Sequence, residues 1–146
     1  MEKRRFQVNK LVRDGLSDHF RNAGLTIYTR VMDEKEYNNR LKDKLLEEAG
    51  EVCDSLTAKE VFSELADLYE VMKAFAELHN FSMEDVEKEA HRKQQERGNF
   101  SKRLYGCYVE IDSTSPVVEY YVARPEEYPE IDEKAYAKLM KDRSNV

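Results

Sequence analysis

Residues 33–79 read DEKEYNNRLKDKLLEEAGEVCDSLTAKEVFSELADLYEVMKAFAELH. The same helix start signal occurs twice in this stretch. Asp33 is followed three residues later by Glu36, and Thr57 is followed at the same distance by Glu60. Such a pair lets the first side chain and the acidic one satisfy free backbone N–H groups at the start of a helix. The stretch therefore predicts two consecutive helices joined by a short turn.

Apolar residues recur at helical spacing after each start signal. The first helix is expected over Glu34–Leu56, and its stripe comprises Tyr37, Leu41, Leu45, Val52 and Leu56. The second helix is expected over Ala58–His79, and its stripe comprises Val61, Leu65, Leu68, Met72 and Phe75. Phe62, Ala66 and Tyr69 form another stripe beside that of the second helix. The second helix is therefore expected to bury more than one side, either as a central helix or against a second subunit.

Further helices are predicted on both sides of this stretch. The segment Asn9–Gly24 is expected to hold a modest helix, and Leu25–Met32 favours an extended conformation. Ser82 with Asp85 predicts the start of a third long helix, which should run to about Arg97. Because the turns between the three long helices are short, we expect them to be antiparallel neighbours in a bundle.

The C-terminal part has a different composition. Tyr105–Ile111 and Val117–Ala123 are rich in β-branched and aromatic residues and are separated by a turn signal, which predicts a β-hairpin. A short last helix is expected over Ile131–Met140. The predicted fold class is mainly α, with an antiparallel helical domain over residues 1–104. Residues 105–146 are expected to form an appendage that is not an independent domain.

Composition excludes several classes of protein. The chain has 146 residues, of which 40% are hydrophobic and 37% are charged, as expected for one globular domain. It contains no apolar run that could cross a bilayer or act as a signal peptide, so we expect a cytoplasmic protein without a membrane partner. The formal net charge of -6 argues against binding of nucleic-acid polymers, which requires a basic surface.

Acidic residues form two groups on the two predicted helices. Glu47, Glu48 and Glu51 belong to the first helix, and Glu64 and Asp67 to the second. Residues three apart on a helix lie roughly 60° apart around its axis and about one turn along it. Each helix therefore presents a pair of neighbouring carboxylates, and the short turn between the helices can bring the two pairs face to face.

The position of the second pair favours a metal site. Glu64 and Asp67 interrupt an apolar stripe, where clustered carboxylates need protons, cationic side chains or metal ions as compensation. Oxygen ligands without His or Cys favour Mg²⁺ or Mn²⁺ over Zn²⁺. The alternative is a solvated surface in which lysines such as Lys44 pair with the acids. A di-iron bundle is excluded because its Glu-x-x-His spacing does not occur.

Basic residues offer candidate phosphate contacts. Lys93 and Arg97 lie one turn apart near the end of the third helix, just before Gly98. Arginine presents a planar fork of donors to phosphate oxygens, and lysine a point charge. The alternative is an ordinary cationic helix end with a glycine cap. Lys10 and Arg13 are equally ambiguous when taken alone.

Taken in order, four segments resemble the MazG-like all-α NTP pyrophosphatase superfamily, which includes dimeric dUTPases and phosphoribosyl-ATP pyrophosphohydrolase. They are Lys10-Leu11-Val12-Arg13-Asp14, Leu45-Leu46-Glu47-Glu48-Ala49-Gly50-Glu51, Glu64-Leu65-Ala66-Asp67 and Arg97-Gly98-Asn99-Phe100. The resemblance covers roughly residues 9–103. It is strongest to the small house-cleaning branch that begins with the Lys-Leu-Val-Arg-Asp opening.

This resemblance implies an all-α core that forms a homodimer and holds Mg²⁺ against the triphosphate of a nucleotide. The implied metal ligands are Glu48, Glu51, Glu64 and Asp67; the implied substrate contacts are Lys10, Arg13, Lys93 and Arg97; and the implied catalytic residues are Glu47, Glu48, Lys93 and Arg97. In the catalytic set, Glu47 or a ligand carboxylate would act as a base through a water, and the two cations would stabilise the pyrophosphate leaving group.

The expected function is Mg²⁺-dependent hydrolysis of nucleoside triphosphates, non-canonical ones included, to a monophosphate and pyrophosphate. Two alternatives remain open on the sequence. One is hydrolysis of a phosphoribosyl nucleotide, as in phosphoribosyl-ATP pyrophosphohydrolase. The other is a helical dimer without enzymatic activity that works as an interaction module.

Overall fold

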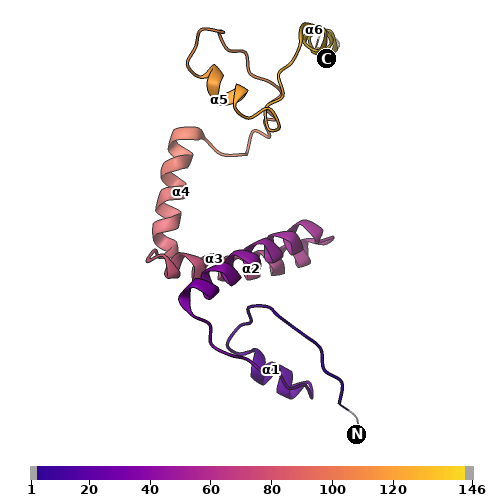
Figure 1. Cartoon of the computed structure of the whole chain (residues 1–146), viewed down its shortest axis with the longest axis vertical. Helices are drawn as coiled ribbons and strands as arrows, with labels where there is room; N and C mark the ends of the chain where they lie inside the picture. Colours follow the sequence, from indigo (N-terminus) through magenta and orange to yellow (C-terminus); the bar gives the residue numbers. More distant parts are fainter. Residues whose placement is uncertain (1–2, 144–146) are drawn as a thin grey trace. The chain divides into compact units, whose positions relative to one another are not determined.

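The computed structural model describes residues 3–143, and within this range it contains six helices and no strand. They are α1 (Leu16–Asn22), α2 (Glu34–Asp54), α3 (Ala58–Leu78), α4 (Met83–Arg97), α5 (Val118–Val122) and α6 (Glu133–Arg143), shown in Figure 1. The mainly helical class is therefore confirmed. Residues 25–32, expected to be extended, form no strand.

The predicted start signals cap the long helices. The Asp33 side chain accepts a hydrogen bond from the backbone N–H of Glu36 at the start of α2. At the start of α3, Thr57 and Glu60 form a complete capping box. Ser82 and its acidic partner do the same for α4, which ends at Gly98, where φ is 79°. Local sequence chemistry thus sets the bounds of these helices, in agreement with the prediction.

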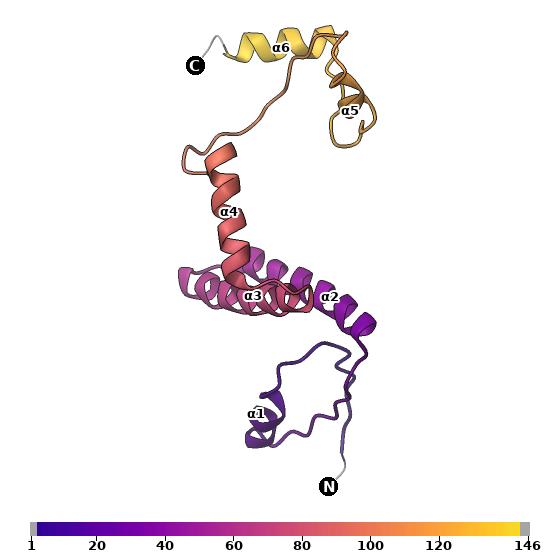
Figure 2. The same cartoon turned by 90° about the vertical axis from the view of Figure 1, so that its left-hand side faces the viewer.

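Helices α2 and α3 form an antiparallel pair that lies side by side along most of its length (Figure 2). Leu41 on α2 and Val71 on α3 are the buried apolar residues of the described chain, and Glu48 is buried with them. A core of this size is small, so most of the apolar surface of α3 remains uncovered. This pair is the element that positions the candidate site.

Helix α4 does not continue the antiparallel arrangement. It contacts α3 only weakly and makes no contact with α2 within the described residues. No residue of α4 is buried, which fits its low content of apolar side chains. The predicted packing of α2 against α3 is therefore observed, whereas a bundle that also includes α4 is not confirmed.

The predicted C-terminal β-hairpin is wrong. Residues 105–111 adopt no regular structure, and the segment expected as the second strand contains α5. The turn between them is present, because Asp112 accepts hydrogen bonds from the backbone N–H and the hydroxyl of Thr114. It leads into a helical turn on which Tyr120 and Tyr121 pack against Tyr128. An isolated hairpin is marginally stable in water, and here aromatic packing favours the helical turn instead.

The chain divides into two compact units, one that extends to Asn99 and one that begins at Phe100. The first contains α1 to α4, and the second contains α5 and α6. Within residues 3–143, no helix combines the length and the apolar character that a membrane span requires.

Candidate metal centre

Three carboxylates from two helices converge on one side of the α2–α3 pair. They belong to Glu48 and Glu51 on α2 and to Glu64 on α3, and one oxygen of each lies within 4.8 Å of the others. Antiparallel packing explains the arrangement, because it sets the last turns of α2 against the first turns of α3. Glu48 is only 5% exposed, Glu64 is half-buried and Glu51 is exposed. We call these three residues the acidic cluster.

The electrostatics of the acidic cluster favour a bound cation. Partial desolvation, together with the like charges of Glu48 and Glu64, raises the pKa of Glu51 above its ordinary value. The folded protein therefore holds a proton on this carboxyl more readily than the unfolded chain does. A cation that neutralises the cluster would remove this repulsion, and carboxylate oxygens are ligands that hard divalent ions accept.

Replacing Glu51 by Gln is expected to raise the melting temperature of the metal-free protein at neutral pH. A carboxyl with a raised pKa stabilises the fold below its unfolded-state pKa, and this contribution is lost as the pH rises through the folded-state pKa. The amide carries no charge, so the variant should not show this loss. Thermal unfolding of the wild type and the variant in EDTA, from acidic to neutral pH, would test this prediction. A variant that melts below the wild type at neutral pH would contradict it.

Lys44 contacts the acidic cluster through Glu48. Its Nζ lies 2.6 Å from Oε1 of Glu48 and 3.3 Å from Oε1 of Glu47. Although burial opposes the charge, hydrogen bonds to Glu48 and Glu47 raise the pKa of Lys44. From the sequence alone, Lys44 is interpreted as one member of an ordinary solvated ion pair. Its spacing of three and four residues from the two acids is the signal that could have singled it out.

The N-terminal segment reaches the same region through two ion pairs. Lys10 lies 2.8 Å from Glu47, and Arg13 pairs with Asp67. The hydrogen bond from Lys10, with a second one from Lys44, lowers the pKa of Glu47. The structure thus places Lys10 and Arg13 beside the acidic cluster. Asp67, a predicted metal ligand, is not part of the three-carboxylate group and takes the arginine instead.

Lys93 and Arg97 are not brought to the acidic cluster within one chain. Both lie in the last turns of α4, a helix that contacts α3 only weakly and makes no contact with α2 within the described residues. At 1.5 Å per residue, Lys93 lies roughly 15 Å along the helix from Met83, the first residue of α4. Its Nζ lies 3.8 Å from Glu89 on the same helix. Any contact of these cations with substrate requires a second chain or a different position of α4.

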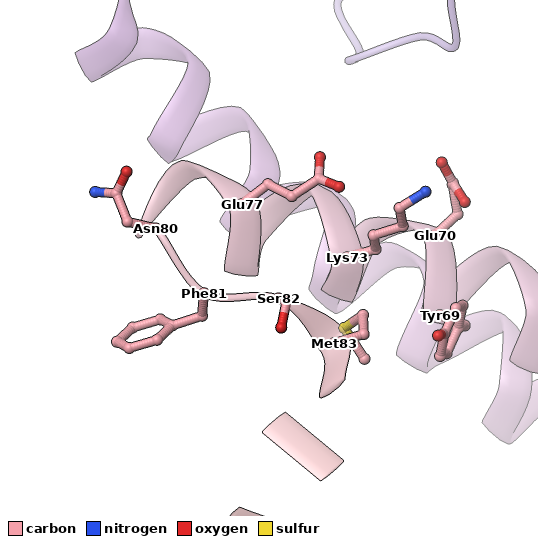
Figure 3. Close-up of a pocket in the computed structure, with 8 residues that line it drawn as sticks. All are labelled: Tyr69, Glu70, Lys73, Glu77, Asn80, Phe81, Ser82 and Met83. Carbon is pink, nitrogen blue, oxygen red and sulfur yellow. The ribbon is translucent and has the colours of Figure 1, made fainter. Parts of the chain in front are cut away.

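A hollow with a volume of about 610 Å³ lies along the second half of α3 and the start of α4 (Figure 3), and no residue of the acidic cluster lines it. Its lining residues are Tyr69, Glu70, Lys73, Glu77, Asn80, Phe81, Ser82 and Met83. Figure 3 shows Asn80 and Phe81 directed away from Tyr69 and Met83, so the side chains do not converge on one point. We assign no chemistry to this hollow.

Comparison with known proteins identifies one family. Residues 15–94, more than half of the chain, match the phosphoribosyl-ATP pyrophosphohydrolase family (PRA-PH). No curated protein and no solved structure matches the chain. The matched range includes the whole acidic cluster with Glu47, Asp67 and Lys93, and it ends before Arg97.

The Lys-Leu-Val-Arg-Asp opening lies outside the matched range, so the comparison does not support the house-cleaning branch in particular. It does support the superfamily, because PRA-PH is a nucleotide pyrophosphohydrolase family among the MazG-like all-α proteins. The matched range contains both helices that carry the acidic cluster, α2 and α3. The chain belongs to the phosphoribosyl-ATP pyrophosphohydrolase family of the MazG-like all-α superfamily.

Proposed function

We propose that the chain is a Mg²⁺-dependent pyrophosphohydrolase that acts on phosphoribosyl-ATP or a closely similar phosphoribosyl nucleotide and releases pyrophosphate. The observation that carries this proposal is the convergence of three carboxylates on two helices that lie inside the matched family range. The family match favours this substrate over ordinary nucleoside triphosphates, which were the main expectation from the sequence.

The residues of the acidic cluster fit a hard divalent cation. Glu48, Glu51 and Glu64 supply only oxygen donors. Burial and the nearby charges of Glu48 and Glu64 raise the pKa of Glu51, and a cation would neutralise this negative charge. Asp67 lies one turn after Glu64 and stays a predicted fourth ligand, although it now pairs with Arg13. When bound, Mg²⁺ neutralises charge on phosphate oxygens and activates water.

Lys10 and Arg13 are proposed to bind the phosphates of the substrate. Their side chains are 55% and 62% exposed, and they stand beside the acidic cluster through Glu47 and Asp67. An exposed ion pair is worth little, so phosphate oxygens can compete for these cations. Glu47 is a weak candidate for the base, because two lysines lower its pKa. We propose that Glu47 instead holds Lys10 near the site.

A homodimer is proposed because α3 presents an uncovered apolar face. Phe62, Leu65, Tyr69 and Met72 recur at helical spacing, and their exposed fractions are 79%, 48%, 47% and 38%. Contiguous apolar surface of this kind is typical of an interface between proteins. A second copy is also one route by which Lys93 and Arg97 can reach a substrate, where they would stabilise the charge of the leaving pyrophosphate.

Hydrolysis of nucleoside triphosphates is the second candidate function. The observation that favours it is the position of the Lys-Leu-Val-Arg-Asp opening, whose Lys10 and Arg13 pair with Glu47 and Asp67, next to the acidic cluster. This opening resembles that of the house-cleaning branch. Both candidate reactions break a phosphoanhydride bond and release pyrophosphate, so the acidic cluster serves either one.

Pyrophosphate release from phosphoribosyl-ATP and from a panel of ordinary and modified nucleoside triphosphates separates these functions. With Mg²⁺, we expect kcat/KM for phosphoribosyl-ATP to exceed that for every triphosphate by at least about tenfold, a difference of about 1.4 kcal/mol. EDTA should abolish the release. Faster release from a triphosphate would favour the second candidate. No release from any substrate by a folded dimer would favour the non-enzymatic interaction module.

A further inference from the structure

Lys44 is in the least exposed ion pair of the described chain. Its side chain is 23% exposed, that of Glu48 is 7% exposed and that of Glu47 is 26% exposed. By contrast, the pair of Arg40 and Asp43 on the same helix is 44% and 61% exposed. Exposed pairs of the second kind contribute little to stability. Lys44 therefore differs from the other helical lysines by its burial and by its two acidic partners.

Glu48 is the carboxylate of the acidic cluster that most needs a counter-charge. It is buried, and the carboxylates of Glu51 and Glu64 lie close to it. Removing one partner of a buried ion pair leaves a charge with neither solvent nor a partner, which is strongly destabilising. Within the part of the chain that the structure describes, Lys44 is the cation that contacts Glu48.

We propose that Lys44 is a positioning residue of the metal site: it holds Glu48 and Glu47 in place and supplies the counter-charge of the acidic cluster until a metal ion binds. This inference rests on the proposed function, because it assigns the metal to Glu48, Glu51 and Glu64. A carboxylate has two oxygens, so the contact of Lys44 with Oε1 of Glu48 leaves the second oxygen for a metal.

The contact with Glu47 extends this role to the phosphate-binding segment. Glu47 accepts hydrogen bonds from both Lys44 and Lys10. Lys44 thus fixes one acid that faces the proposed metal and one that anchors a proposed phosphate contact. A change at Lys44 is therefore expected to alter catalysis through the placement of other groups, without direct contact between Lys44 and the substrate.

The test compares Lys44→Met with the wild type in EDTA and in Mg²⁺. In EDTA, the melting temperature of Lys44→Met should fall by at least about 5 °C, because Glu48 loses its counter-charge. Adding Mg²⁺ should raise the melting temperature of this variant more than that of the wild type, because the metal is then the remaining counter-charge. With Mg²⁺ bound, kcat should fall at least about tenfold while KM changes less.

Two further variants separate positioning from general stability. Lys44→Arg keeps the charge and can bridge two carboxylates, so it should restore the wild-type response to Mg²⁺ and most of the activity. Lys42→Met removes an exposed lysine from the opposite side of α2 and should behave as the wild type. If Lys44→Met does not fold in EDTA, its refolding on addition of Mg²⁺ would support the proposal and its failure to refold would count against it.

The proposal is overturned if Lys44→Met has the wild-type melting temperature and the wild-type increment with Mg²⁺. Failure of the proposed function gives a different result. In that case Mg²⁺ would not raise the melting temperature of the wild type, whereas Lys44→Met would still melt below Lys42→Met in EDTA. That outcome would remove the metal site and the positioning role while retaining the ion pair as a structural feature.

Discussion

Replacing Glu64 by Gln is expected to lower kcat/KM for pyrophosphate release by at least about a hundredfold while the helical content stays unchanged. Loss of a group that only supports a metal ligand typically costs tenfold to a hundredfold, and loss of a ligand costs at least as much. Glutamine keeps the shape of the side chain and removes the charge that a divalent cation requires. Steady-state kinetics in saturating Mg²⁺ and circular dichroism together measure the two parts of this expectation.

Glu64 gives a cleaner test than Glu48. It is half-buried and has no ion-pair partner within the described residues, so its substitution leaves no cation stranded. Substitution of Glu48 would also deprive Lys44 of its closest partner. Glu70→Gln is the matched control, because Glu70 is an exposed acid on the same helix outside the acidic cluster. A fully active Glu64→Gln enzyme would rule out the proposed metal site.

Helix bounds were predictable because their causes are local. The capping boxes at Thr57 and Ser82 satisfy backbone N–H groups within four residues, so the sequence alone specifies them. The meeting of Glu48 and Glu64 was predictable for a similar reason. A short turn between two long helices leaves antiparallel packing as the simple arrangement, and it sets the end of one helix against the start of the next.

Other features of the candidate site depend on which of several possible partners a side chain contacts. A sequence pattern does not show which partner is favoured. Asp67 has the spacing of a metal ligand, yet Arg13 from a distant segment takes its carboxylate. Lys44 has the spacing of an ordinary surface pair, yet packing of α3 against α2 buries its partner. The predicted hairpin is wrong because the tyrosines that are typical of strands here pack against one another around Tyr120 on a helical turn.

Contacts within the described chain do not account for the apolar face of α3, which remains exposed. Apolar side chains such as Phe62 and Tyr69 remain exposed on a helix whose opposite side packs on α2. The sequence predicts that this helix buries more than one side, as a central helix or against a second subunit, whereas in the described chain the second stripe is not covered. Aromatic and methionine side chains are enriched in the cores of protein interfaces, and a few of them contribute most of the binding energy.

Replacing Tyr69 by Lys is therefore expected to weaken self-association by at least about a hundredfold and to shift the protein to a monomer at micromolar concentration. A lysine at this position would place a charge in the centre of the proposed interface, where no carboxylate of the stripe can pair with it. Sedimentation velocity over a concentration series measures the effect. Activity should fall with dimer content if Lys93 and Arg97 act across the two copies.

Glu70→Lys is the matched control for this effect. It introduces the same side chain at the next position of α3, on a side that carries polar residues, and it changes the net charge even more. A dimer that persists in Glu70→Lys and dissociates in Tyr69→Lys would assign the interface to the apolar face and not to charge. A wild-type protein that sediments as a monomer would contradict the proposed homodimer. If that monomer were fully active, a second chain would not be needed for the reaction. Either α4 would then have to move within one chain to bring Lys93 and Arg97 to the substrate, or these cations would take no part in the reaction.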